Sequence, residues 1–268
     1  MSATITRFTL PLLLLCAALL SACDKSSPAP SSSPAAAAQA QQVYRVGTDA
    51  AYAPMEMMVD GKQPTGFDID LMSAIAERGG FRIEFINTPF ESIFNSLLQG
   101  DRDLLISAIT ITPERLRSVS FSEPYFEARQ LIVTVGGQLR VRGAGDLSGL
   151  KVGVQSATTG DIAMQKLLGR NNTAIRRFES MPLALAELTA GGVDAVVGDE
   201  AVVRHFIAGS KGAGPAYRIV ADDNFGKEYY GIAVRPGDQA LLERINRGLA
   251  AVRADGTYER IRARYFGS

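Results

Sequence analysis

The stretch Leu97-Leu98-Gln99-Gly100-Asp101-Arg102-Asp103-Leu104-Leu105-Ile106-Ser107 returns in altered form as Leu188-Thr189-Ala190-Gly191-Gly192-Val193-Asp194-Ala195-Val196-Val197-Gly198. Both copies contain an apolar helix end, a glycine, an aspartate three residues later, three apolar residues and a small residue. An apolar run of this length is typical of a strand buried on both faces of a parallel sheet. The constant offset favours two similar α/β lobes, although any short helix–strand unit could share the pattern.

The sequence around each copy alternates between strand and helix patterns, which predicts parallel strands joined by crossover helices. The expected strands cover 43–48, 81–86, 104–106, 151–154, 176–178 and 195–197. The expected helices cover 67–79, 93–98, 162–168 and 183–189. We therefore expect an α/β protein of two lobes, each an open, mostly parallel sheet flanked by helices.

The N-terminus has the pattern of a secretory signal peptide. Arg7 is followed by the apolar run 8–20, which is shorter than the roughly 20 residues that cross a bilayer. The run ends in Leu20-Ser21-Ala22-Cys23, which resembles a lipobox. We expect residues 1–22 to be removed and Cys23 to carry a lipid. The alternative is an ordinary cleavage site followed by a chance cysteine.

The segment 23–42 is rich in Ser, Pro, Ala and Gln and contains no aromatic residue. Such a composition buries too little apolar surface to fold, so we expect a disordered tether. Asp24 after the lipidated cysteine slightly favours retention in the inner membrane. The predicted location is the cell envelope, lipid-anchored and facing the periplasm.

Composition excludes several classes of function. The 28 basic and 28 acidic residues balance, which argues against a nucleic-acid partner. One histidine and no cysteine cluster argue against a zinc site. The other cysteine, Cys16, lies in the signal peptide, so no disulfide is expected in the mature fold. We expect neither a metal nor a cofactor.

Ligands of open α/β sheets bind beyond the carboxyl ends of the strands. The sequence places Asp49, 107–110, 155–160 and Asp199 at those ends. The turn 155–160 precedes a helix and could offer backbone N–H groups to a carboxylate.

Arg115 lies in the first turn of a helix that begins at Thr112-Pro113, where a cation is unfavourable unless an anion lies nearby. This position predicts an anion site made by the guanidinium and the helix N-terminus. The alternative is a solvent-facing arginine paired with Glu114 or another surface carboxylate.

Asp199 could accept hydrogen bonds from an ammonium group, or it could cap the following helix. Together, Arg115 and Asp199 offer opposite charges from opposite lobes, which suits a zwitterion. Tyr52 and Phe90 could wall a side-chain pocket, although Phe90 could equally belong to the core. A carboxylate at Asp49 favours a positive or amide-bearing ligand side chain.

Several motifs resemble the family-3 extracellular solute-binding proteins, which are the polar amino-acid receptors of ABC importers. The resemblance covers 43–267 and rests on Thr48-Asp49-Ala50-Ala51-Tyr52-Ala53-Pro54, Gly66-Phe67-Asp68-Ile69-Asp70-Leu71, Ser107-Ala108-Ile109-Thr110-Ile111-Thr112-Pro113-Glu114-Arg115, Phe121-Ser122-Glu123-Pro124-Tyr125, Val152-Gly153-Val154-Gln155 and Asp255-Gly256-Thr257-Tyr258. It implies a two-lobed type II binding-protein fold with a two-strand hinge. The implied lobes are 43–130 plus 228–268, and 131–227, with 229–232 as the strand that returns to the first lobe.

The resemblance also implies roles for individual residues. Arg115 would bind the ligand α-carboxylate and Asp199 its α-ammonium group. The other ligand-contacting residues would be Asp49, Tyr52, Phe90, Ser107, Ala108, Thr110, Thr158 and Thr159. Two positions depart from relatives, because Gly160 and Ala108 stand where polar side chains are found.

The function that these features imply is a monomeric receptor with no catalytic residues. Its partners would be a free amino acid with a basic or amide side chain, a membrane permease, and the membrane itself through the lipid anchor. The alternative is a periplasmic cyclohexadienyl dehydratase on the same scaffold, with Asp199 or Glu123 as general acid. A third possibility is a ligand-sensing partner of a separate membrane receptor.

Overall fold

The computed structural model describes residues 42–136, 141–210 and 215–267. The expected signal peptide 1–22, the lipidated Cys23 and the tether as far as residue 41 lie outside these residues. Within the described part of the chain, no helix is both long enough and apolar enough to span a bilayer.

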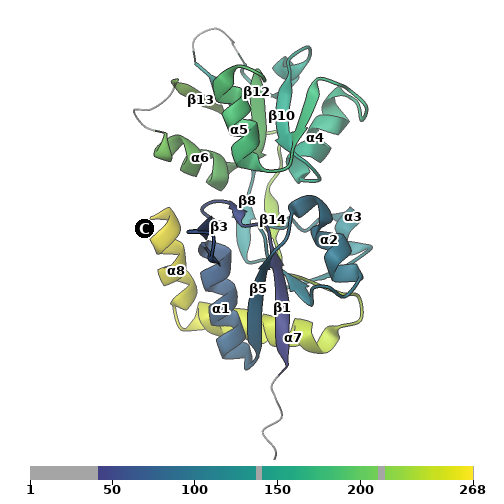
Figure 1. The fold of residues 1–268 in the computed structure, drawn as a ribbon, viewed down its shortest axis with the longest axis vertical. Helices are drawn as coiled ribbons and strands as arrows, with labels where there is room; N and C mark the ends of the chain where they lie inside the picture. Colours follow the sequence, from purple (N-terminus) through teal and green to yellow (C-terminus); the bar gives the residue numbers. More distant parts are fainter. Residues whose placement is uncertain (1–41, 137–140, 211–214, 268) are drawn as a thin grey trace, which may run out of the picture. The chain divides into compact units, whose positions relative to one another are not determined.

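The first lobe is built on a five-stranded sheet of order β5-β1-β6-β15-β7 (Figure 1). Its strands are β1 (Val43–Thr48), β5 (Arg82–Asn87), β6 (Leu104–Leu105), β7 (Ser120–Phe121) and β15 (Ala233–Val234). β1 pairs in parallel with β5 and β6, whereas β15 runs antiparallel between β6 and β7. The sheet is therefore completed by a strand from the far end of the chain.

The second lobe repeats this arrangement with a five-stranded sheet of order β11-β10-β12-β9-β13. Its strands are β9 (Gln130–Val135), β10 (Val152–Gln155), β11 (Ile175–Phe178), β12 (Ala195–Asp199) and β13 (Tyr217–Val220). β10 is parallel to β11 and β12, and β9 is antiparallel to β12 and β13. The two predicted α/β lobes are thus confirmed, each with a single reversed strand.

The aspartate of the sequence repeat has the same structural role in both lobes. Asp103 accepts a hydrogen bond from the backbone N–H of Arg45 at 2.9 Å, and Asp194 accepts one from the backbone N–H of Lys151 at 2.7 Å. Arg45 lies in β1, and Lys151 directly precedes β10. The repeated aspartate directly precedes the central strand of each sheet, β6 or β12, and therefore fixes the start of that strand to its neighbour β1 or β10.

Helices cover both faces of the two sheets. In the first lobe, these are α1 (Phe67–Gly79), α2 (Phe90–Leu98), α7 (Gln239–Ala254) and α8 (Thr257–Phe266), with the single turn α3 (Pro113–Leu116). In the second lobe, they are α4 (Thr159–Leu168), α5 (Met181–Ala190), α6 (Glu200–Gly209) and the 3-10 turn η1 (Ala144–Leu147). α1 and α7 pack closely at Gly248, where a Cβ atom would lie 2.3 Å from the carbonyl oxygen of Ile75.

Two antiparallel strands connect the lobes, β8 (Phe126–Ala128) and β14 (Glu228–Tyr230) (Figure 1). The expected return strand 229–232 is therefore divided. Its first part belongs to β14, and the chain enters the first sheet only at β15. Gly231 lies between β14 and β15. A Cβ atom there would be 2.9 Å from side-chain atoms of Ile111 and Phe121, so these side chains pack against the chain at the point where the two strands are divided.

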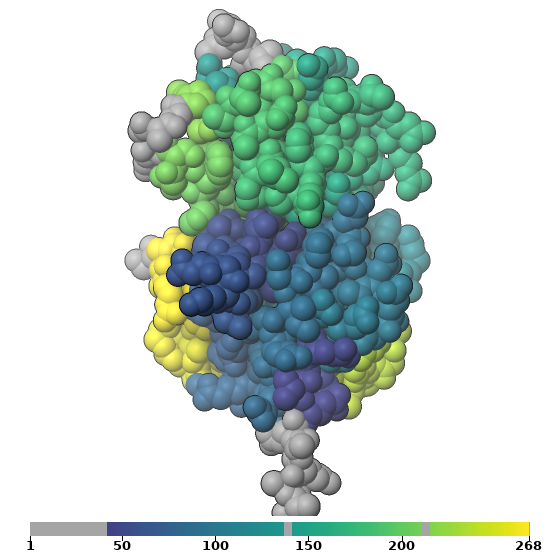
Figure 2. Space-filling model, viewed as in Figure 1, coloured from purple at the N-terminus to yellow at the C-terminus, as the bar shows by residue number. Residues whose placement is uncertain are grey.

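The facing edges of the two lobes are in contact in the space-filling view (Figure 2). A small sheet of β2 (Ala51–Tyr52), β3 (Glu56–Val59) and β4 (Gln63–Thr65) follows β1. It carries the first lobe's segment Asp49–Tyr52 toward the second lobe, where Gln155 donates to Asp49. The carboxyl ends of β1, β6, β10 and β12 thus meet in one place.

Candidate functional site

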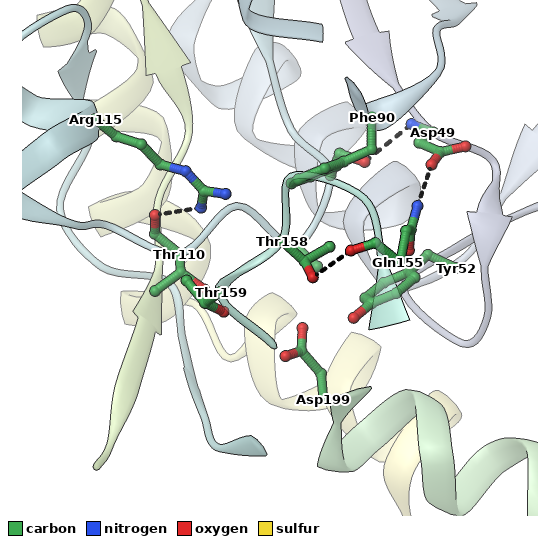
Figure 3. Close-up of a pocket in the computed structure, with 11 residues that line it drawn as sticks. Asp49, Tyr52, Phe90, Thr110, Arg115, Gln155, Thr158, Thr159 and Asp199 are labelled. Carbon is green, nitrogen blue, oxygen red and sulfur yellow. Dashed lines mark hydrogen bonds between the residues drawn. The ribbon is translucent and has the colours of Figure 1, made fainter. Parts of the chain in front are cut away.

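One pocket lies where the strand ends of the two lobes meet (Figure 3). Its lining residues come from both lobes, and they include every ligand-contacting residue expected from the sequence. They are Asp49, Tyr52, Phe90, Ser107, Ala108, Thr110, Arg115, Gln155, Thr158, Thr159 and Asp199. Gln155 is the one lining residue that the predicted set lacks, although it belongs to the turn 155–160 noted at a strand end.

Arg115 supplies the positive charge of the pocket. The side chain of Thr112 caps α3 by accepting from the backbone N–H of Arg115 at 3.2 Å. The guanidinium then turns into the cleft, where it donates to the carbonyl oxygens of Thr110 at 2.8 Å and Ala157 at 3.2 Å. Its carbon lies 5.6 Å from the ring centre of Phe90 and 5.1 Å from that of Phe94.

The guanidinium of Arg115 has no carboxylate partner within 4.0 Å among the described residues. The alternative of a surface pair with Glu114 is wrong, because Glu114 pairs with Arg117 instead. Burial lowers the pKa of Arg115 to about 10, so the side chain stays charged at neutral pH. Since α3 has only four residues, the guanidinium rather than this helix supplies the field for an anion.

The turn after β10 offers further donors to an anion. Thr158 caps α4, accepting from the backbone N–H of Asp161 at 3.3 Å, and its hydroxyl donates to the carbonyl of Gln155 at 2.8 Å. Thr159 and Gly160 therefore stand in the first turn of a ten-residue helix beside the pocket. Backbone N–H groups at this end of a helix favour a negative group.

Asp199 supplies the negative charge from the second lobe. It ends β12 and stands at the N-cap of α6, but its side chain makes no capping hydrogen bond. The carboxylate accepts instead from the Tyr230 hydroxyl at 2.6 Å and from the Gln130 amide. The capping alternative is thus wrong for the side chain. Burial, helped by the nearby charge of Glu228, raises the pKa of Asp199 to about 6.

Glu228 is a functional candidate that the sequence did not reveal. Its Oε2 accepts from the hydroxyls of Thr110 at 2.9 Å and Thr159 at 2.8 Å, which belong to different lobes. It also accepts from Gln130 at 3.2 Å. Because both hydroxyl hydrogens point to Glu228, the hydroxyl oxygens act as acceptors, and that of Thr159 accepts from the Gln130 amide at 3.1 Å. Glu228 lies on the connecting strand β14, and only the folded arrangement brings it beside both threonines.

Asp49 and Gln155 lie side by side in the lining of the pocket. Gln155 donates to Asp49 Oδ2 at 2.9 Å and to the carbonyl of Glu179 at 3.2 Å. Its Oε1 is buried and has no donor among the described residues. Burial raises the pKa of Asp49 to about 6. A carboxylate and an orphaned amide oxygen side by side are suited to a ligand group that carries several N–H donors.

The two aromatic side chains line the pocket and are both nearly buried, Tyr52 at 6% exposure and Phe90 at 7%. Phe90 also packs in a cluster with Ile93 and Leu97. The pocket and the core interpretations of Phe90 therefore both hold.

Ser107 and Ala108 are fixed by hydrogen bonds to residues outside the pocket lining as well as to Asp49. The Ser107 hydroxyl donates to Glu56 at 2.8 Å and accepts from the backbone N–H of Asp49 at 2.9 Å. The backbone N–H of Ala108 donates to Asp68 at 2.8 Å. Ala108 has a φ of 45°, a left-handed conformation that residues with a Cβ atom rarely adopt.

Other candidates lie elsewhere. Glu123, one of the two general acids considered for a dehydratase, is exposed and does not line the pocket. Residues 42–136, 141–210 and 215–267 contain no cluster of three His, Cys, Asp or Glu side chains arranged to hold a metal ion.

Comparison with known proteins agrees with this architecture. Residues 44–268 match the family model of bacterial extracellular solute-binding proteins, family 3. The "Probable histidine-binding protein" of Neisseria gonorrhoeae is 42% identical over 258 residues, which cover 94% of this chain and 93% of the relative. The "ABC transporter arginine-binding protein 1" of Escherichia coli (strain K12) is 34% identical over 231 residues, covering 85% and 93%.

Among solved structures, the arginine-, lysine-, histidine-binding protein ArtJ of Geobacillus stearothermophilus superposes with a TM-score of 0.80 at 39% identity. The match covers 85% of this chain and 96% of ArtJ. The family match and the similarity to these relatives lead to one conclusion: this chain belongs to the family-3 bacterial extracellular solute-binding proteins.

Proposed function

We propose that this protein is the substrate-binding receptor of an ABC-type amino-acid importer and closes around a free L-amino acid. The observation that supports the proposal best is the separation of charge in one pocket. Arg115 of the first lobe and Asp199 of the second lobe both line it. A molecule with a carboxylate and an ammonium group on one carbon matches this pair.

The α-carboxylate would bind to the remaining N–H groups of Arg115 and to the backbone N–H groups at the start of α4. The α-ammonium group would bind to Asp199 and to the hydroxyl oxygen of Thr110. Glu228 supports this division, because it takes the hydroxyl hydrogen of Thr110 and leaves an oxygen to accept. Charge-assisted hydrogen bonds of this kind are the strongest in proteins.

The side chain of the ligand would extend toward Asp49 and Gln155, between Tyr52 and Phe90. A cation gains from the Asp49 carboxylate, from the free Gln155 Oε1 and from the aromatic faces. The relatives are named for histidine, arginine and lysine. We therefore propose a basic amino acid as the preferred ligand, with an amide-bearing one as the second choice.

Binding would stabilise the closed form because the ligand contacts both lobes. The two connecting strands β8 and β14 are the natural place for the hinge. Cross-lobe hydrogen bonds from Gln155 to Asp49 and from Arg115 to Ala157 already join the lobes. The ligand adds its own contacts, and this difference between open and closed forms shifts the population toward closure.

The setting of this receptor would be the periplasmic face of the cell envelope. In this proposal Cys23 carries the lipid, 23–42 is the tether, and a monomer delivers its ligand to a membrane permease. Metabolic labelling with a fatty-acid analogue tests the anchor, since a Cys23→Ala variant should lose the label and leave the membrane fraction.

The binding function is tested by calorimetry against the twenty amino acids and ornithine, with Arg115→Ala and the exposed neighbour Arg117→Ala as a matched pair. Arg115→Ala should abolish binding and keep the fold, whereas Arg117→Ala should bind as the wild type does. Unchanged affinity in Arg115→Ala would show that the carboxylate site is wrong. No observation favours the dehydratase alternative, and conversion of prephenate to phenylpyruvate would contradict the receptor proposal.

A further inference from the structure

A pair of carboxyl groups is buried beneath the pocket, outside the residues that line it. Glu56 lies on β3 and Asp68 in the first turn of α1, and both side chains are completely buried. The start of α1 rests on the segment before β3, with Asp68 N–H donating to the Met55 carbonyl at 2.9 Å. At Gly66 a Cβ atom would lie 2.2 Å from the same carbonyl, so the glycine permits this contact.

The two carboxyl groups require a proton between them. Glu56 Oε2 and Asp68 Oδ1 are buried without a donor from the described residues, and the two side chains are in hydrogen-bonding contact. Two ionised carboxylates in such contact repel each other strongly. One proton shared by Oε2 and Oδ1 removes the repulsion and satisfies both orphaned oxygens.

Asp68 is the better place for the remaining negative charge. It accepts from the Ala108 N–H at 2.8 Å and from the Tyr125 hydroxyl at 2.7 Å. It also lies at the positive end of α1, which has 13 residues. Glu56 therefore keeps the proton. In agreement, burial raises the pKa of Glu56 well above its usual value, and that of Asp68 only to about 6.

The two oxygens on the far side of the pair hold the binding segment 107–110. Glu56 Oε1 accepts from the Ser107 hydroxyl, which in turn accepts from the backbone N–H of Asp49. Asp68 Oδ2 accepts from Ala108 and so supports its left-handed backbone. A strained conformation at a binding site persists only where neighbouring groups hold it.

The surroundings of the pair contain acidic and phenolic groups. Asp49 faces it from the end of β1, Tyr52 from β2, Tyr125 from the segment before β8, and Tyr258 from α8. Among the described residues, no Lys, Arg or His nitrogen lies within 4.0 Å of the Glu56 or Asp68 carboxyl oxygens. The proton, and not a salt bridge, is what makes this pair compatible with burial.

We propose that Glu56 and Asp68 share one proton and act as positioning residues, setting segment 107–110 in the conformation that binds the ligand. This inference rests on the proposed receptor function. It assigns a role to Glu56 and to the motif residue Asp68, neither of which lines the pocket.

The test compares Glu56→Gln with Glu56→Leu, using the amino acid that the wild type binds best in calorimetry. Glutamine keeps an acceptor for Ser107 and a donor for Asp68, whereas leucine has a similar size and neither. We expect Glu56→Gln to bind within about threefold of the wild type, and Glu56→Leu to bind roughly ten- to a hundredfold more weakly. Leu249→Ala in α7 serves as the control for loss of stability alone and should leave affinity unchanged below its melting temperature.

A second readout keeps the test independent of the leucine variant. Carboxyl ¹³C resonances of the empty protein at pH 7.5 should show one protonated member of the pair in the wild type. In Glu56→Gln, Asp68 should be ionised. Two ionised carboxylates in the wild type would overturn the proposal, as would wild-type affinity in a folded Glu56→Leu variant.

The amide resonance of Ala108 separates this inference from the function itself. It should move in Glu56→Leu and stay in place in Glu56→Gln, whether or not a ligand is known. A wild-type protein that binds no amino acid would overturn the receptor proposal alone. An Ala108 resonance that ignores both substitutions would overturn the positioning role.

Discussion

Gln155 and Asp49 belong to different lobes, yet the amide nitrogen of Gln155 lies 2.9 Å from the carboxylate of Asp49. This bond lies in the lining of the pocket, and the side-chain Oε1 of Gln155 has no donor among the described residues. The pair therefore has two roles. It holds the lobes together, and in the proposed complex it offers two acceptors to the ligand side chain.

Replacement of Gln155 should therefore change selectivity. We expect Gln155→Leu to weaken binding of a basic amino acid by about 1–2 kcal/mol, the cost of lost hydrogen bonds to a charged group. Apolar amino acids should lose much less. Calorimetry on both ligand classes measures the difference, with the exposed Gln99→Leu as control. Equal losses for both classes would show that Gln155 does not contact the ligand side chain.

Acid should weaken ligand binding. Burial raises the pKa of both Asp49 and Asp199 to about 6, and an ammonium or other cationic ligand group requires their ionised forms. Each protonation must be reversed on binding, so affinity should fall by up to about tenfold per pH unit for each group below pH 6. Calorimetry between pH 8 and 5 tests this. A flat profile would mean that neither carboxylate binds a cation.

The empty protein should respond to acid in the opposite sense. Because the folded pKa values of Asp49 and Asp199 lie above the usual value, each contributes stability that is complete below about pH 4 and is lost as pH rises through 6. The free energy of unfolding should thus increase from pH 7 to pH 5, by about 1–2 kcal/mol from each group. Urea titrations of wild type and Asp199→Asn measure it, and the variant should show a smaller increase.

The charge of Glu228 should influence the pH at which ligand affinity begins to fall. Its charge raises the pKa of Asp199, so Glu228→Gln should lower that pKa while the amide oxygen still accepts from Thr110 and Thr159. We expect the fall in affinity to begin at a lower pH than in the wild type. The exposed Glu127→Gln on the partner strand β8 is a suitable control. If affinity falls at the same pH in Glu228→Gln and in the wild type, the charge of Glu228 does not raise the pKa of Asp199.

The repeated aspartates should differ in their contribution to stability. Asp103 binds the backbone and side chain of Arg45 and also Arg235, while Asp194 accepts from the backbone of Lys151. We expect Asp103→Ala to cost about 2–3 kcal/mol of unfolding free energy and Asp194→Ala about 1 kcal/mol. Urea denaturation measures both. Equal losses would indicate that the arginine contacts of Asp103 contribute nothing.

Much of the fold could be predicted from local pattern. The buried runs at β6 and β12, the alternation at β1 and β5, and the glycine stops of α1 and α5 are short-range signals. The strand ends then indicated where Asp49 and Asp199 would meet, and the position of Arg115 in the first turn of a helix indicated an anion site. Asp199 was ambiguous in sequence because an N-cap and a ligand-binding carboxylate look alike until the hydrogen bonds of the side chain are known.

Other features depend on contacts between distant segments and had no local signal. Glu228 reads as an ordinary polar residue at the start of a strand, and its role appears only when Thr110 and Thr159 meet there. Glu56 likewise looks like a surface residue beside two methionines. Its burial follows from the packing of α1 against the segment 54–56. The hydrophobic periodicity of the sequence does not predict this packing. The division of 229–232 at Gly231 is also set by packing against Ile111 and Phe121.

The insertion of β15 between β6 and β7 has a consequence for biosynthesis. The second-lobe sheet is drawn from one uninterrupted segment, 130–220, whereas the first-lobe sheet needs a strand at 233–234 and the helix α7 behind it. When the first 220 residues have been made, the nascent chain contains every strand of the second sheet but lacks β15 of the first. The lobe that contains β1 is therefore finished after the other lobe, and β6 and β7 stay without their shared neighbour until residues 233–234 have been made.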